Sequence, residues 1–212
     1  MYLTRLILNP QNRRVQKEIA APYEMHRTIL SAFPPRMAED ERVLWRLEVQ
    51  PRTGLPVLLV QSQELPDWFC VSATKAPNFL MQTNQPNPAI KAYDPQITKG
   101  RQLSFRLRAN PTVKREGKRL GLYREEEQIT WLQRKAFQHG FRLLDFRIST
   151  QEIVTSTIHR GEETHTLKLF GIQYDGMLVV EEAMQFREAL EHGIGSGKGM
   201  GFGLLSVASP GR

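Results

Sequence analysis

The chain has very little cysteine and no long apolar segment. Its 212 residues include one cysteine, Cys70, which excludes an internal disulfide and a metal site built from several cysteines. No apolar run approaches the roughly 20 residues that a membrane-spanning helix needs. Residues 1–9 are too short and too charged to serve as a secretory signal peptide. We therefore expect a soluble, cytoplasmic protein that has no membrane partner.

The histidines also fail to form a recognisable metal site. The five histidines fit no zinc-binding spacing, and they have no cysteine co-ligands. We therefore expect neither a metal nor another cofactor.

Positive charge, in contrast, is in excess. The sequence has 29 Lys and Arg against 22 Asp and Glu, a formal net charge of +7. A balance of this kind favours a polyanionic partner such as nucleic acid, although an ordinary basic enzyme is compatible with it too.

The order of the predicted elements is the same in the two halves of the chain. In the first half we expect strands at 3–8, 43–49, 57–60 and 103–109, helices at 11–20 and 22–33, and a short helix with a long loop in 64–100. In the second half we expect strands at 119–123, 141–146, 153–158, 167–172, 177–180 and 204–207, helices at 125–139 and 182–192, and a turn at Asp175-Gly176. Both halves read β-α-β-β-α-β. This order predicts an α+β fold of two tandem ferredoxin-like domains, the topology of the RNA-recognition motif, with domains at 1–110 and 119–212 and a basic linker at 111–118.

Six glycines alternate with other residues between Gly193 and Gly203, around Lys198. Glycine permits a close approach of the backbone to a ligand or to another segment, and lysine adds positive charge. A Walker loop is excluded because Gly199 follows Lys198 and because His192 occupies the position of the first glycine; no dinucleotide fingerprint fits either. A flexible turn and a close-approach loop for an anion both remain open.

A second candidate for binding an anion is the basic stretch from Arg101 to Arg124, which contains eight Lys or Arg and one acid, Glu116. A solvated charged surface would explain it, and so would a seam along which a nucleic-acid backbone lies. The candidate RNA-binding residues here are Arg106, Arg108, Lys114, Arg115, Lys118 and Arg119.

Tyr23 and His26 lie three residues apart on the predicted helix after Pro22, so their side chains share one face. The neighbouring stripe is apolar. A packed, hydrogen-bonded edge and a catalytic pair are both consistent with this pattern.

Four segments together resemble the CasE family, the CRISPR-associated repeat-processing endoribonucleases of Cascade-type (subtype I-E) systems. They are the N-terminal Met-Tyr-Leu-Thr-Arg, the helix segment Tyr23-Glu-Met-His26-Arg27, the segment from Phe105 to Pro111, and the ending from Gly193 to Ser206. The resemblance covers essentially the whole chain.

The resemblance implies two ferredoxin-like domains and metal-independent cleavage of CRISPR repeat RNA at the 3′ base of its hairpin. It also implies that the processed guide is retained in Cascade with other subunits. His26 matches the catalytic histidine and Tyr23 a nearby tyrosine, while Arg160 and Lys198 match positions that contact RNA. We add Arg27 to the candidate RNA-binding residues and expect a monomer when the protein is free.

Two other functions remain open. A non-cleaving subunit that binds an RNA hairpin would show the same resemblance, because binding and cleavage use different residues. A protein that binds a nucleotide or another small molecule through the glycine-rich segment is disfavoured by the failed motifs.

Overall fold

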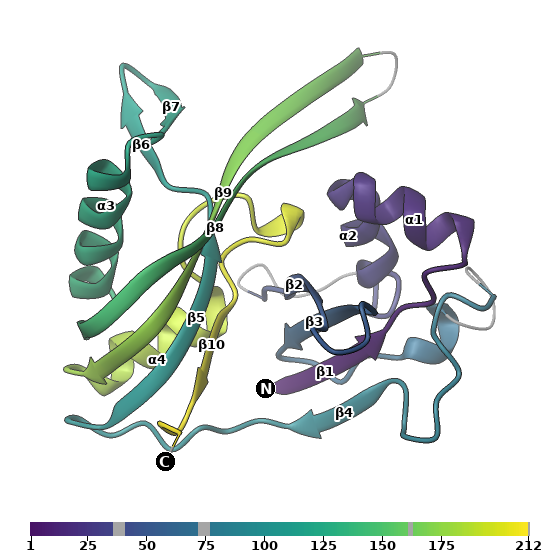
Figure 1. The fold of residues 1–212 in the computed structure, drawn as a ribbon, viewed down its shortest axis with the longest axis horizontal. Helices are drawn as coiled ribbons and strands as arrows, with labels where there is room; N and C mark the ends of the chain where they lie inside the picture. Colours follow the sequence, from purple (N-terminus) through teal and green to yellow (C-terminus); the bar gives the residue numbers. More distant parts are fainter. Residues whose placement is uncertain (36–40, 72–76, 161–162, 212) are drawn as a thin grey trace. The chain divides into compact units, whose positions relative to one another are not determined.

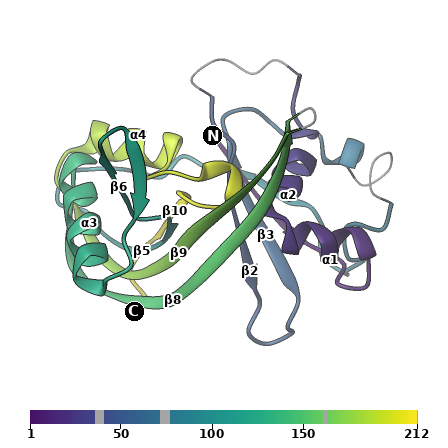
Figure 2. The same cartoon turned by 90° about the horizontal axis from the view of Figure 1, so that it is seen from above.

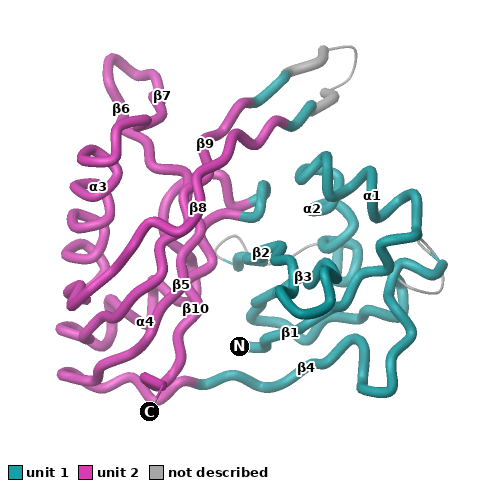
Figure 3. Tube along the Cα trace, viewed as in Figure 1, with its two compact units in different colours: residues 1–94, 156–167, 199–201 teal, residues 95–155, 168–198, 202–212 magenta. Residues whose placement is uncertain are grey.

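The computed structural model describes residues 1–35, 41–71, 77–160 and 163–211; of residues 158–160 and 163–165 it describes the backbone alone. These ranges contain two four-stranded sheets with helices packed on them, and a separate two-stranded sheet (Figure 1). The chain divides into two compact units (Figure 3). Unit 1 comprises Met1–Asp94, Ser156–Leu167 and Gly199–Gly201, and unit 2 comprises Pro95–Thr155, Lys168–Lys198 and Phe202–Arg212.

The sheet of unit 1 has the strand order β2-β3-β1-β4. Its strands are β1 (Tyr2–Ile7), β2 (Leu44–Val49), β3 (Pro56–Ser62) and β4 (Ala89–Ala92). The central strands pair antiparallel with Leu6 opposite Leu58, and both side chains are buried. Helices α1 (Arg13–Ala20) and α2 (Pro22–Leu30) lie on one side of this sheet (Figure 2). The core they share includes Leu6, Leu8, Val15, Met25, Ile29, Trp45, Leu58, Val60, Trp68 and Phe79.

A buried polar contact joins α1 to α2. The hydroxyl of Thr28 on α2 donates to Glu18 Oε1 on α1 at 2.7 Å. Arg14 forms an ion pair with the same carboxylate, with Nε 2.6 Å from Oε1, and donates from Nη2 to the Thr28 hydroxyl at 3.0 Å. Because Glu18 and Thr28 are buried, this charge-assisted contact restricts how α2 can move against α1.

Unit 2 repeats the same topology with different strands. It contains β5 (Gln102–Ala109), α3 (Glu125–Gln138), β8 (Phe141–Arg160), β9 (Glu163–Val180), α4 (Ala183–His192) and β10 (Leu205–Ala208). The order β10-β5-β9-β8 places the fourth and first strands beside each other, as in unit 1. The face that packs on α3 and α4 carries Leu103, Phe105, Leu107, Ile172, Tyr174, Leu178 and Leu205. The predicted α+β fold with two ferredoxin-like units is therefore confirmed.

Strand β5 belongs to a different sheet from the one predicted. We expected residues 103–109 to close the first half, but β5 pairs with β10 and β9 in unit 2. The short strand β4 takes the fourth position in the first sheet instead. Alternation of apolar and polar residues identifies a strand but not its partner, so the pattern alone could not assign β5. The domain boundaries at 110 and 119 remain a prediction.

The segment that we expected to be a linker is a β-hairpin. Strands β6 (Thr112–Arg115) and β7 (Lys118–Gly121) pair antiparallel across a two-residue turn at Glu116 and Gly117. Both turn residues have positive φ, 49° and 77°, as a tight hairpin turn requires. The strand predicted at 119–123 overlaps β7, whereas the charge of the segment obscured β6 in the sequence.

The predicted turn at Asp175-Gly176 is wrong, because β9 runs without a break from Glu163 to Val180. Gly176 is required there for space: a Cβ at this position would lie 2.2 Å from the carbonyl oxygen of Asp145 on β8. Asp175 forms an ion pair with Arg106 on β5. The Asp-Gly sequence thus reflects a close contact between strands and a charge pair across the sheet.

None of the helices in the described ranges is long and apolar enough to cross a membrane.

Candidate active site

Helix α2 is the element that presents Tyr23 and His26. Pro22 occupies its first turn, where a missing N–H costs nothing. The N-cap residue, Ala21, has no side chain that can accept a hydrogen bond. Ser156 of β8, which also belongs to unit 1, supplies the missing acceptor: its hydroxyl oxygen accepts a hydrogen bond from the backbone N–H of Tyr23 at 3.3 Å. The start of the helix is therefore capped by a buried serine 133 residues away.

The imidazole of His26 is partly buried, one turn of helix beyond Tyr23. Its Nδ1 is buried and has no hydrogen-bond partner among the described residues. Burial lowers the pKa of His26 below the ordinary value of 6.5, because desolvation disfavours the charged ring. The free protein therefore holds a neutral imidazole near pH 7, the form that can accept a proton.

The glycine-rich segment packs on the chain's own side chains. A Cβ at Gly199 would lie 3.1 Å from His26 Cδ2, and a Cβ at Gly201 would lie 2.8 Å from Trp45. Between them Met200 is buried, and so is Phe202 after them. The alternative of a flexible turn is therefore wrong, and the close approach implied by the glycines has a partner inside the protein.

Lys198 begins a short 3-10 helix, Lys198–Met200, and is half-buried. It belongs to unit 2, where its charge helps to lower the pKa of His139, after the larger effect of burial. Arg27 is exposed on α2 and forms an ion pair with Glu24 at 3.1 Å. Contacts of Lys198 and Arg27 with RNA remain predictions.

The basic stretch separates into two groups. Arg106 and Arg108 lie on β5, on the face opposite α3 and α4, and each has a carboxylate partner. Arg106 Nε lies 2.5 Å from Asp175 Oδ1, and Arg108 Nη2 lies 2.5 Å from Glu152 Oε1. Arg108 also stacks over the Phe202 ring, 5.1 Å from its centroid. Both arginines therefore have acidic partners within unit 2.

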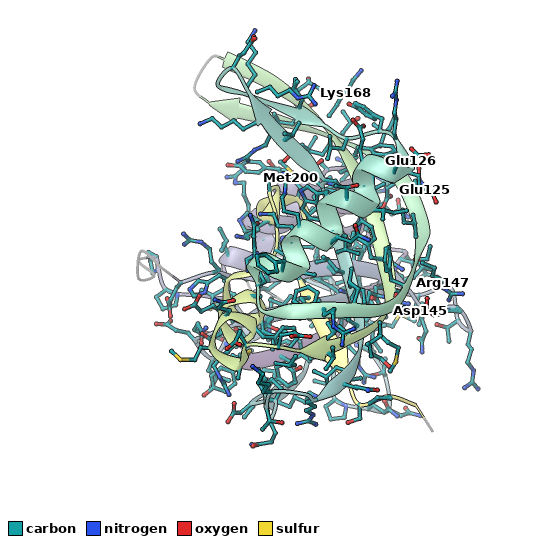
Figure 4. The ribbon with its side chains drawn as sticks, turned by 90° about the vertical axis from the view of Figure 1, so that its left-hand side faces the viewer. Glu125, Glu126, Asp145, Arg147, Lys168 and Met200 are labelled. Atoms are coloured by element: carbon teal, nitrogen blue, oxygen red, sulfur yellow. The ribbon has the colours of Figure 1, made fainter. Side chains whose placement is uncertain are left out.

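The other group lies on the β6–β7 hairpin, where Lys114, Arg115, Lys118 and Arg119 are all exposed. The register places Lys114 opposite Arg119 and Arg115 opposite Lys118. Like charges directly across two strands repel, so this hairpin carries two unfavourable pairs that a polyanion would relieve. The beginning of α3 (Figure 4) cannot act as an anion site, because Glu125, Glu126 and Glu127 occupy its first turn.

Arg160 ends β8 next to the gap in the described residues, and its side chain lies outside them. Its predicted contact with RNA therefore remains a prediction. Within the described ranges, no group of three or more His, Cys, Asp or Glu could hold a metal ion.

Two residues of this site escaped the sequence analysis. Nothing in the pattern around Ser156 relates it to a helix cap, because the two partners are far apart in the chain. Gly199 was visible as one of the alternating glycines, but its partner was not. Only the tertiary fold brings Ser156, Gly199 and α2 together in unit 1.

Comparison with known proteins identifies relatives along the whole chain. Residues 1–209 match the family described as "CRISPR associated protein". The chain is 39% identical over 221 residues to the CRISPR-associated endoribonuclease Cse3 of Thermus thermophilus, covering 98% of this chain and 100% of that protein. It is 28% identical over 224 residues to the CRISPR system Cascade subunit CasE of Escherichia coli, with 98% and 99% covered.

Solved structures are similar over the same length. A structure of the CRISPR endoribonuclease Cse3 bound to 19 nt RNA superposes with a TM-score of 0.84 at 35% identity, covering 98% of this chain and 100% of that chain. Thermus thermophilus Cse3 bound to an RNA representing a pre-cleavage complex gives a TM-score of 0.82, also at 35% identity, with 98% of each chain covered. The CRISPR-associated protein Cas6e from Escherichia coli gives 0.67 at 26% identity, with 99% and 100% covered.

The environment of His26 predicts how its charge depends on pH. Burial lowers the pKa of the folded state, so the unfolded state binds the proton first as the pH falls. The folded protein therefore loses stability as the pH falls through 6.5 toward the folded pKa, and this loss is absent at higher pH. A titration of the His26 ring by NMR in the free protein should give a midpoint below 6.5. A midpoint at or above 6.5 would contradict the desolvated environment.

Proposed function

The chain belongs to the CRISPR-associated protein family, and we propose that it is an endoribonuclease of this family that cleaves CRISPR repeat RNA at the 3′ base of its hairpin. The observation that carries the proposal is the partly buried imidazole of His26 on α2, which packs against the backbone of Gly199 and has a pKa lowered by burial. The names of the relatives supply RNA as the substrate class. The proposal includes retention of the processed RNA with other Cascade subunits, which the name of the Cascade subunit CasE supports. A cytoplasmic location and a monomeric free state remain part of the proposal.

The reaction needs no metal in this proposal. The 2′-hydroxyl oxygen next to the scissile bond attacks the phosphorus, and the bond to the 5′-oxygen breaks. His26 enters the reaction neutral and accepts the 2′-hydroxyl proton, and the imidazolium so formed can donate a proton to the departing 5′-oxygen. The products are a 2′,3′-cyclic phosphate and a 5′-hydroxyl.

Tyr23 and the cations have supporting roles. A phenolic hydroxyl can donate a hydrogen bond, so Tyr23 donates to the phosphate and orients it. Lys198 is suited to stabilise the charge that develops on the phosphate oxygens. A positioned acid or base contributes about 10²–10⁴-fold, and the rest of the rate comes from holding the phosphate in line.

The β6–β7 hairpin is the surface best suited to the phosphate backbone. Its four exposed cations lie on the two strands that flank a tight turn, and the cross-strand repulsion within both pairs is reduced when phosphates bind. Arg27, Arg106, Arg108 and Arg160 extend the proposed RNA-binding set.

Cleavage of hairpin RNA in EDTA tests the catalytic assignment. Wild-type protein should cleave a synthetic repeat RNA and leave a cyclic phosphate. The His26→Ala variant should lose about 10²–10⁴-fold in single-turnover rate, because the proton transfer is lost, while hairpin affinity is kept. Loss of wild-type activity in EDTA would indicate a metal nuclease. RNA binding by the wild type without any cleavage would indicate the non-cleaving subunit.

The salt dependence of affinity tests the hairpin. Each phosphate contact contributes roughly −0.7 to the slope of log affinity against log salt. The double variant Lys114→Gln/Arg119→Gln should therefore have a shallower slope than the wild type. Lys99→Gln is a matched control, because Lys99 is also an exposed cation of unit 2 but forms an ion pair with Glu182. An unchanged slope in the double variant would exclude these residues from the RNA contact.

A further inference from the structure

We propose that Gly199 is a positioning residue for the reaction. Its backbone packs against the imidazole of His26 and fixes the ring, and because Gly199 has no side chain, the Nε2 edge of the ring stays open to the substrate. This inference rests on the proposed role of His26 in proton transfer. It concerns a contact of the backbone and not a contact with RNA.

The contact involves one particular edge of the ring. A Cβ at Gly199 would lie 3.1 Å from Cδ2 and 3.4 Å from Nε2 of His26. The distance to Cδ2 is tighter than ordinary packing and the distance to Nε2 is at its lower limit, so a methyl group there would require the ring to give way by a few tenths of an ångström.

The two ring nitrogens are not equivalent. Nδ1 is buried with no hydrogen-bond partner in the described part of the chain, so it cannot reach a substrate without a movement of the ring. The proton must therefore pass through Nε2, the nitrogen on the edge that faces Gly199. What stands beside this edge decides whether the scissile group can approach it.

The requirement for glycine at 199 is one of space and not of backbone conformation. Gly197 and Gly201 have φ values of 82° and 80°, where side chains are strained, but Gly199 has no such positive φ. Alanine can therefore adopt the backbone conformation of Gly199, and a substitution there reports on the ring alone.

The turn that carries Gly199 cannot easily move away from the ring. Met200, labelled in Figure 4, is 5% exposed, and the next residue, Gly201, packs on the buried ring of Trp45 at a distance that leaves no room for a Cβ. Since the next two residues of the turn are anchored, an added methyl group displaces the imidazole instead of the backbone.

The test compares Gly199→Ala with wild type in single-turnover cleavage and in RNA binding. We expect a loss of roughly 10-fold or more in the cleavage rate at saturating protein, because small misplacements of a reacting group are costly, and an unchanged dissociation constant for the hairpin. The His26 Cδ2–H resonance should shift in the NMR spectrum of the free variant, which a loss of RNA contact would not cause. A larger side chain, in Gly199→Val, should reduce the rate further.

Gly211→Ala serves as the control, because a Cβ there meets nothing within 4 Å. A wild-type rate and an unshifted His26 resonance in Gly199→Ala would overturn the inference, and weaker RNA binding with an unchanged saturated rate would assign Gly199 to the RNA contact instead. The single variant His26→Ala separates the two proposals. If His26→Ala abolishes cleavage and Gly199→Ala has no effect, only the positioning role fails. If His26→Ala retains full activity, the proposed catalytic function itself fails.

Discussion

Close packing of glycine backbone against aromatic rings is the constraint on which the site depends. A Cβ at Gly201 would lie 2.8 Å from the indole of Trp45, which leaves no room for it, and a Cβ at Gly199 would lie 3.1 Å from the imidazole of His26, which would then have to give way slightly. Burial of the ring then lowers its pKa, and the cap from Ser156 fixes the first turn of the helix that carries it. The polar contact of Thr28 with Glu18 holds the same helix from α1. Two segments distant in sequence, together with the preceding helix α1, therefore determine the position of one imidazole.

The positive charge of the protein serves two physical purposes. Arg106 and Arg108 are neutralised by carboxylates on neighbouring strands and contribute to the sheet surface. The cations of the β6–β7 hairpin face one another across the strands, an arrangement that is unfavourable in the absence of an anion. The net charge does not show which cations have acidic partners, but the register of the strands does, because it shows which side chains face one another. The hairpin is therefore the part of the basic stretch that suits a phosphate backbone.

The sequence predicts the elements of this fold better than their partners. Alternation identified β5, and the spacing of Tyr23 and His26 placed both side chains on one face of α2, because both patterns are local. The sheet to which β5 belongs depends on long-range pairing, and the first strand of the hairpin at 112–121 was hidden by its charges. Asp175-Gly176 carries a local turn signal, yet a close contact with β8 explains the glycine. The partner of Gly199 lies 173 positions away at His26, beyond any local pattern.

The contact between Gly199 and His26 can be observed directly as a nuclear Overhauser effect. The account predicts a strong cross-peak between the α-protons of Gly199 and the Cδ2 proton of His26 in the free protein, and its loss in His26→Ala. A well-resolved spectrum of folded wild-type protein without this cross-peak would contradict the account, because the imidazole would then lie elsewhere.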